Sequence, residues 1–276
     1  QMLRNDIAKA AASIAPAGAL NSLSQALLRM TAPGVPDLYQ GCEFWDFSLV
    51  DPDNRRPIDF GARVAALSAD EAVTTSAKAD PNQGEELVKH WQDGHIKQWL
   101  VAKTLNARGQ YPSLFTEGNY QALQVEGDGA DQIIAFARQH GSKYLVVIAP
   151  RLCANLLGDS AIPLVSPSAW GDTRVKLPGA LHTATTLVDS FSSFNFSPLK
   201  SSPIKHSPIK HSSPDHIQLK DSVLVSELLA HSPVNFFIFD TINSSVSNSS
   251  SKYSPASSTP ASPHTPTPYG EVSHEH

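Results

Sequence analysis

The chain has 276 residues, 41% of them hydrophobic, which is enough for one or two domains with a buried core. Lys and Arg number 21 against 26 Asp and Glu, so the formal net charge is −5 and gives no electrostatic reason to expect a nucleic acid or an anionic membrane as partner. No apolar run approaches the roughly 18 residues of a membrane span, and the N-terminus has no apolar signal core. We therefore expect a soluble, cytoplasmic protein.

The first segment predicts a helix followed by a strand. A helix is expected over residues 20–31, capped by Asn21 or Ser22, because apolar residues recur at helical spacing: Leu20, Leu23, Leu27 and Met30. Residues 35–41, VPDLYQG, are short, apolar and bounded by Gly41, which predicts a buried strand. Helix, short loop and buried strand form the repeating unit of an α/β fold.

The next segment is predicted to be helical. A helix capped by Asp59 is expected to present Phe60, Val64 and Leu67 on one side. A second helix is predicted over residues 85–107, although Gly94 weakens it. Three aromatic residues are assigned to the core and two lysines to solvated helix faces: Trp91, Trp99 and Phe115, then Lys97 and Lys103.

From about Gly118 the pattern changes to short runs rich in β-branched and aromatic residues, such as QIIAFARQH and KYLVVIAPRL. Separated by Gly, Asp and Ser, these runs are typical of an antiparallel β-sandwich. The tandem SPIKH repeat at residues 202–211 is predicted to be a solvated insertion, with His206 and His211 incidental rather than metal ligands. The Ser, Thr and Pro-rich tail is predicted to be disordered.

The two cysteines predict neither a disulfide nor a zinc site. Cys42 and Cys153 lie far apart and outside any metal-ligand or C-x-x-C spacing. Both are expected to be buried, reduced thiols. No metal or cofactor is predicted.

Several motifs resemble a known family. APGVPDLYQGCEFWD resembles the eighth barrel strand of the α-amylase superfamily, glycoside hydrolase family 13, and LVDPDNRRPIDF narrows the resemblance to the maltooligosyl trehalose synthases. WQDGHIKQWLVAKTLNAR, PSLFTEGNYQALQVEG and SELLAHSPV resemble the C-terminal part of those enzymes. The resemblance covers roughly residues 18–190 well and 217–239 loosely.

The resemblance implies a domain organisation. Residues 1–110 would be the last βα units of a (β/α)₈ barrel, namely a helix, strand eight, a substrate loop and following helices. Residues 111–239 would be a C-terminal β-sandwich with an insertion at about 195–216, and residues 240–276 a disordered tail. The chain would then be a C-terminal fragment.

The resemblance also implies an activity. A family member converts the reducing-end α-1,4 link of a maltooligosaccharide into an α,α-1,1 link by retaining intramolecular transglucosylation, without a cofactor, and works with a maltooligosyltrehalose trehalohydrolase. Retaining chemistry needs two carboxyl groups, one as nucleophile and one as acid then base. In this superfamily the nucleophile, the acid/base and a third carboxylate follow strands four, five and seven, so no catalytic residue is assigned and the fragment is expected to be inactive alone.

The loop after the predicted strand supplies the candidate substrate residues. Asp51 and Arg55 suit a carboxylate and a forked guanidinium that together bind vicinal sugar hydroxyls. The other candidates are Asn54, Arg56, Glu43, Tyr39 and Trp45. The competing interpretation is an internal network in which Arg55 or Arg56 pairs with a neighbouring Asp to pin the loop, and in which the aromatic residues simply pack.

Two other functions stay open at this point. One is another α-amylase-type glucan hydrolase or transferase, which LVDPDNRRPIDF makes less favourable. The other is a carbohydrate-binding or structural β-sandwich without chemistry, which the missing catalytic strands favour.

Overall fold

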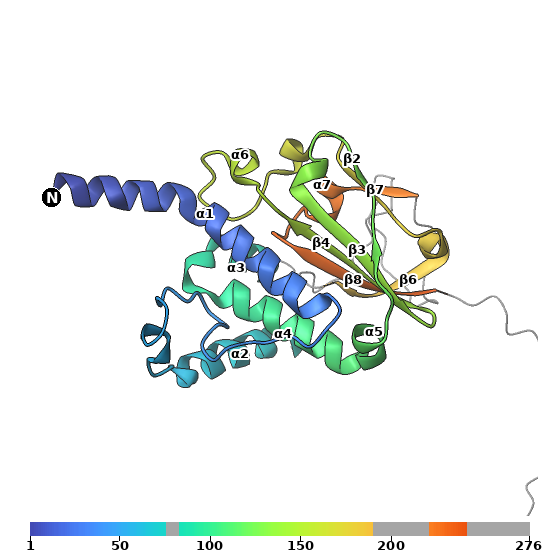
Figure 1. Ribbon diagram of the computed structural model, residues 1–276, viewed down its shortest axis with the longest axis horizontal. Coiled ribbons are helices and arrows are strands. Elements are labelled where there is room, and N and C mark those ends of the chain that lie inside the picture. Colours follow the sequence, from blue (N-terminus) through green and yellow to red (C-terminus); the bar gives the residue numbers. More distant parts are fainter. Residues whose placement is uncertain (76–82, 190–220, 242–276) are drawn as a thin grey trace, which may run out of the picture. The chain divides into compact units, whose positions relative to one another are not determined.

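The computed structural model describes residues 1–75, 83–189 and 221–241, without the side chains of 69–75, 83 and 182–189. These residues form helices and two antiparallel sheets (Figure 1). The helices are α1 (Met2–Thr31), α2 (Phe60–Thr75), α3 (Gln83–Lys89), α4 (His95–Gln110), α5 (Pro112–Thr116), α6 (Ala154–Leu157) and α7 (Val225–Leu228). The strands are β1 (Gln121–Ala122), β2 (Val125–Glu126), β3 (Ile133–His140), β4 (Lys143–Pro150), β5 (Arg174–Lys176), β6 (Ala184–Asp189), β7 (Ser222–Leu224) and β8 (Asn235–Thr241).

Helix α1 contains the predicted helix but begins far earlier, at Met2 rather than at Leu20. Burial starts only at Pro16, and residues 1–14 are all exposed (Figure 1). Apolar periodicity reports burial rather than helicity, so it marked only the half of α1 that packs on the core. The N-terminal half is helical without an apolar face in contact with the described residues.

The single helix predicted over residues 85–107 is wrong. Gly94 adopts a left-handed conformation with φ of 85°, and its N–H donates to the carbonyl of Trp91. A β-carbon at Gly94 would lie 3.1 Å from both the Phe44 β-carbon and the Trp45 nitrogen. The glycine therefore ends one helical segment, begins α4 and admits another part of the chain close to the backbone.

The buried strand predicted over residues 35–41 is also wrong, because this segment is irregular and mostly exposed. Val35 keeps 95% of its surface and Tyr39 46%. A strand needs a neighbour to pair its N–H and carbonyl groups, and none of the described strands lies beside it. The described residues accordingly form no closed barrel, whereas helices and antiparallel sheets are both present as predicted.

The larger sheet has the strand order β1-β3-β4-β8-β6 and the smaller one β2-β5-β7, with every pairing antiparallel. Strands β3 and β4 form a hairpin in which Ile133 faces Pro150 and His140 faces Lys143. Strand β4 then pairs with β8, so two segments about 90 residues apart lie at the centre of the sheet. The predicted antiparallel runs at QIIAFARQH and KYLVVIAPRL are confirmed.

One hydrophobic core joins the helices to the larger sheet. Helix α1 contacts both α4 and β4, and α5 contacts β3 and β4. The Ser24 hydroxyl donates to the Pro150 carbonyl at 2.7 Å, and the buried Arg138 guanidinium donates to the Gly118 carbonyl at 2.7 Å. Strand β4 is buried along nearly its whole length instead of alternating, so both of its faces are covered, one of them by the helices.

The predicted core aromatic residues Trp91, Trp99 and Phe115 are buried, as expected. Lys97 is also buried, so its assignment to a solvated face is wrong. Strand β8 includes Asp240 and Thr241, two residues of the segment predicted as tail. The SPIKH insertion and the rest of the tail lie outside the described residues. Of the helices that are described, none combines the length and apolar character needed to cross a bilayer.

Candidate functional site

Residues 42–58, called the 42–58 loop below, connect the irregular segment after α1 to helix α2. A pocket of about 270 Å³ opens on this loop. Gln40, Gly41, Trp45, Asp46, Phe47, Ser48, Asp53, Asn54, Arg56, Ile58 and Arg63 line it. The lining combines carboxylates, guanidinium groups, an amide and aromatic rings, which together offer both donors and acceptors of hydrogen bonds.

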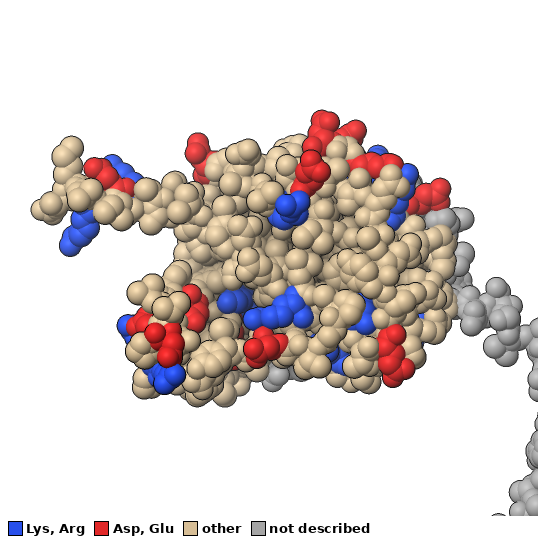
Figure 2. Space-filling view, in the orientation of Figure 1, with Lys and Arg blue, Asp and Glu red and all other residues tan. Residues whose placement is uncertain are grey.

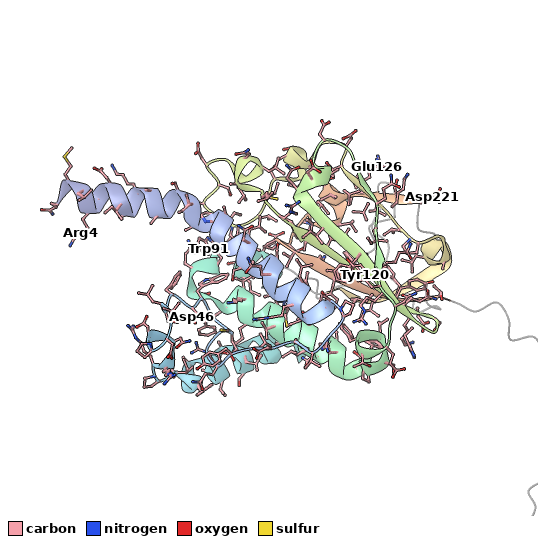
Figure 3. All side chains as sticks on the ribbon, viewed as in Figure 1. Arg4, Asp46, Trp91, Tyr120, Glu126 and Asp221 are labelled. Carbon is pink, nitrogen blue, oxygen red and sulfur yellow. The ribbon has the colours of Figure 1, made fainter. Side chains whose placement is uncertain are left out.

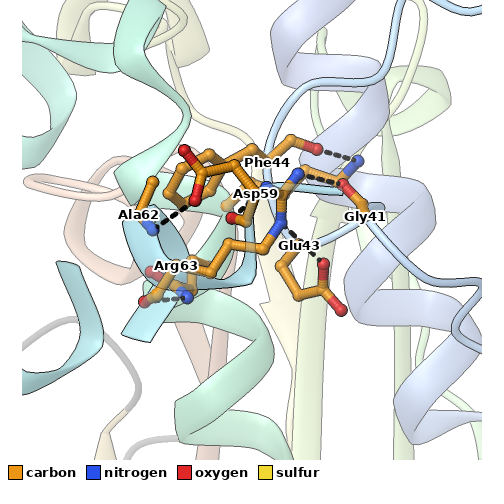
Figure 4. Close-up of polar contacts among 8 residues, drawn as sticks. Gly41, Glu43, Phe44, Asp59, Ala62 and Arg63 are labelled. Carbon is orange, nitrogen blue, oxygen red and sulfur yellow. Dashed lines mark hydrogen bonds and ion pairs between the residues drawn. The ribbon is translucent and has the colours of Figure 1, made fainter. Parts of the chain in front are cut away.

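Arg63, in the first turn of α2, holds both ends of the loop (Figure 4). Its guanidinium donates to the carbonyl of Gly41 at 2.8 Å and to that of Asp59 at 3.0 Å. It also pairs with the Glu43 carboxylate at 3.1 Å and lies 4.7 Å from the centre of the Phe44 ring. The side chain is 15% exposed, so these contacts are partly shielded from water and fix the loop against α2.

The N-cap predicted at Asp59 is confirmed, since its Oδ1 accepts the Ala62 N–H at 2.9 Å. The predicted packing face of α2 is wrong, because Phe60 and Val64 are more than half exposed. Arg63 and Ala66 point toward the rest of the molecule instead. The capping residue correctly predicted where α2 begins. Which side of α2 faces the rest of the molecule is determined by the polar contacts of Arg63.

Trp45 anchors the middle of the loop to the segment that precedes α4. Its indole N–H donates to the Trp91 carbonyl at 2.6 Å, and the two rings meet edge to face with centres 6.1 Å apart. The Lys97 ammonium donates to the Phe44 carbonyl at 3.2 Å and lies 5.6 Å from the Trp45 ring. Burial lowers the pKa of Lys97, and nearby Arg29 lowers it further. Trp45 therefore packs, as the competing interpretation expected, while it also lines the pocket.

The DPDNRR segment forms two ion pairs of its own. Arg55 pairs with Asp51, with one hydrogen bond of 2.9 Å, and Arg56 pairs with Asp53. Asp53 also accepts the Leu49 N–H at 2.7 Å. The internal network expected as the competing interpretation is thus present, although Asp51, Arg55 and Arg56 remain more than half exposed and accessible to a ligand.

Asp46 and Asn54 complete the polar lining of the pocket. Asp46 accepts the N–H and the hydroxyl of Ser48 at 2.9 and 2.6 Å, and these hydrogen bonds lower its pKa. Asn54 differs, because its Oδ1 is buried and has no hydrogen-bond partner among the described residues. A buried acceptor without a donor is costly, so this atom favours a bound donor from outside the loop.

Of the seven predicted substrate residues, the pocket lining brings together Trp45, Asn54 and Arg56. Asp51 and Arg55 lie outside the lining, Glu43 is held by Arg63, and Tyr39 is exposed before the loop begins. The sequence interpretation missed Arg63 because it lies on the following helix. Its position four residues after the capping Asp59 was the available signal.

The cysteines are free thiols: Cys153 is buried as expected, whereas Cys42 is only half-buried. Burial raises the pKa of Cys153 to about 11. Within the part of the chain that the structure describes, no cluster of three or more His, Cys, Asp or Glu residues could share a metal ion.

Comparisons with known proteins identify the same group of enzymes as the sequence motifs do. Putative maltooligosyl trehalose synthases of two Mycobacterium tuberculosis strains are each 35% identical to this chain over 166 residues. The predicted resemblance is confirmed. The matched region is 59% of this chain but only 18% of each curated relative. No family model matches the chain.

A solved variant of maltooligosyltrehalose synthase from Arthrobacter ramosus has a similar fold, with a TM-score of 0.54 and 28% sequence identity. The superposition covers 82% of this chain and 23% of that one. A glycosyltrehalose synthase gives a TM-score of 0.47 at 21% identity over 88% of this chain and 23% of its own, which is too low to support an argument. The chain thus spans about a fifth of the length of the maltooligosyl trehalose synthases that it resembles.

Proposed function

We propose that this chain is the C-terminal part of a glucosylmutase that converts the reducing-end α-1,4 link of maltooligosaccharides into the α,α-1,1 link of trehalose. The 35% identity to putative maltooligosyl trehalose synthases is the observation that carries this proposal. The similarity extends to the fold of the Arthrobacter ramosus enzyme. It favours the mutase over another α-amylase-type enzyme or a β-sandwich without chemistry. On this proposal the whole enzyme is cytoplasmic and acts before a trehalohydrolase.

Within that enzyme, we assign the 42–58 loop to one wall of the sugar pocket. A sugar hydroxyl both donates and accepts hydrogen bonds, and the exposed Asp51–Arg55 pair presents an acceptor beside a forked donor. Asn54 adds a buried acceptor without a partner. At about 270 Å³ the pocket is at the small end of ligand sites, which suits one sugar unit of a longer chain.

We further propose that the loop carboxylates bind and orient but do not catalyse. A general acid in glycoside chemistry needs a protonated carboxyl whose pKa is raised by an apolar environment. Asp46 shows the opposite, since the Ser48 hydrogen bonds lower its pKa. Glu43 is paired with Arg63, and Asp53 with Arg56. The nucleophile and acid/base would then come from other parts of the enzyme.

The experiment for this assignment has a catalytic and a binding readout. Incubated with maltopentaose, the 276-residue chain should leave the reducing ends unchanged, whereas loss of reducing ends would contradict the absence of catalytic carboxylates. In a calorimetric titration, Asn54→Ala should bind maltopentaose about tenfold more weakly than the wild type, because a hydrogen bond from a sugar hydroxyl to the buried Asn54 oxygen is lost. Arg174→Ala, an exposed arginine on β5, is the matched control and should bind normally.

A further inference from the structure

A second pocket, of about 330 Å³, opens beside α1. Ser22, Gln25, Ala26 and Arg29 of α1 line it, together with Cys42 and Lys97. It shares no lining residue with the pocket of the 42–58 loop. In Figure 2, Lys and Arg atoms gather on the surface where α1 passes over α4.

The charge of this pocket has one sign. Among the described residues that line this pocket, the charged ones are Arg29 and Lys97, and none is a carboxylate. Glu43 and Asp46 lie outside this lining but act electrostatically on Lys97, and each also makes another contact: Glu43 pairs with Arg63 at 3.1 Å, and Asp46 accepts from Ser48. The lining itself therefore carries positive charge and no carboxylate.

Both cationic groups have donors to spare. Lys97 is 8% exposed, yet its ammonium has three N–H groups and donates to the Phe44 carbonyl. Arg29, which is exposed and has five N–H groups, makes neither a hydrogen bond nor an ion pair with any described residue. Ser22 and Gln25 contribute a hydroxyl and an amide to the same lining.

We propose that this pocket binds a small oxyanion, a phosphate or carboxylate group, between Arg29 and Lys97. An anion there adds negative charge beside both cations, reduces the repulsion between them and accepts hydrogen bonds from the guanidinium fork and the ammonium. A neutral sugar fits less well, because the charged groups of this lining only donate. The first pocket, in contrast, carries carboxylates and guanidinium groups together.

The site does not depend on the proposed glucosylmutase function, since it requires no glucan and shares no lining residue with the first pocket, although Lys97 also contacts the 42–58 loop. The test is a calorimetric titration of the 276-residue chain with inorganic phosphate at constant ionic strength. Arg29→Gln should bind phosphate about tenfold more weakly than the wild type, because one charge-assisted hydrogen-bonding group is lost. Arg4→Gln is the matched control: Arg4 lies on the same helix near its N-terminal end (Figure 3) and should leave binding unchanged.

A second variant and two further ligands complete the test. Lys97→Met, with its fold checked by circular dichroism, should weaken phosphate binding as much as Arg29→Gln does. Glucose 6-phosphate and acetate distinguish a phosphate from a carboxylate source, and binding of either by the wild type with loss in Arg29→Gln supports the site. The proposal is overturned if the wild type binds none of these anions, if Arg29→Gln and Arg4→Gln bind equally, or if neutral maltose displaces phosphate.

Discussion

The larger sheet and the 42–58 loop are stabilised in opposite ways. Strands β3, β4 and β8 are almost entirely buried and are joined by continuous backbone pairing. The loop has no strand, exposes Phe47, Leu49 and Val50, and is held by polar contacts from Arg63 and Trp45. Apolar burial stabilises the sheet. In the loop, some polar groups hold the backbone in place and others stay accessible to a ligand.

The largest expected effect separates the two regions directly. Phe236, the second residue of β8, is fully buried, so Phe236→Ala should reduce the free energy of unfolding by about 3–5 kcal/mol through lost burial and a cavity. Phe47→Ala is the matched loop variant and, with 89% of Phe47 exposed, should change it by less than about 0.5 kcal/mol. Urea denaturation followed by fluorescence measures both. Equal losses would mean that the loop is packed as the sheet is.

A smaller effect is expected where the loop touches the helices, at Gly94. Gly94→Ala should cost about 1–3 kcal/mol, because φ is positive and the new β-carbon would crowd Phe44 and Trp45. Gly109→Ala, on the same helix α4 and with no atom within 4 Å of the added carbon, should be neutral or slightly stabilising. Thermal unfolding of the two variants compares them, and similar melting temperatures would contradict the close approach.

Arg63→Met tests the polar clamp. It removes the contacts to Gly41, Asp59 and Glu43, so the free energy of unfolding should fall by about 1–3 kcal/mol. The loop should also become a better substrate for trypsin at the Arg55–Arg56 bond, and the cleavage rate measures this loosening. The exposed Arg174→Ala is the control. Wild-type cleavage of Arg63→Met would show that the loop is held by other contacts.

The smallest expected effect lies in the larger sheet, in the ion pair between Lys143 at the start of β4 and Asp240 near the end of β8. Burial raises the pKa of Asp240, but hydrogen bonds from Ser142 and Lys143 outweigh it and lower the value. A lowered folded-state pKa stabilises the fold above the unfolded value near 3.9 and loses that stabilisation as the pH falls through the folded value.

Asp240→Asn should therefore lose less than about 1 kcal/mol at pH 7, as exposed pairs do, and nothing below the folded pKa. Denaturation curves from pH 7 to pH 2 follow this difference. A gap between variant and wild type that widens toward low pH would have the wrong sign.

The sequence predicted most of the sheet and little of the loop, for a physical reason. The runs around Phe136 and Val146 carry their own signal, since β-branched and aromatic residues between turn residues specify strands locally. The segment at Val35 carries a similar apolar signal, yet whether it forms a strand depends on a neighbour. Arg63 and Lys97 also contact distant segments, at Gly41 and Phe44, and a local pattern does not encode those partners.

The candidate site shows the same division. The DPDNRR motif correctly located a cluster of charged residues, and spacing alone allowed the Asp51–Arg55 pair to be either a sugar grip or an internal link. In the structure Asp51 and Arg55 form the internal ion pair. Whether the pair also binds sugar depends on a ligand, which neither sequence spacing nor internal contacts include.

One experiment separates these two roles of Asp51 and Arg55. It measures maltopentaose binding and the melting temperature of Asp51→Ala, Arg55→Ala and the Arg174→Ala control. Because the pair is exposed, its loss should leave the free energy of unfolding within about 0.5 kcal/mol of the wild type. As a sugar grip, its loss should weaken maltopentaose binding about tenfold or more, while the control binds normally. Unchanged binding with a lowered melting temperature would contradict the sugar-pocket assignment and leave the pair as a structural link.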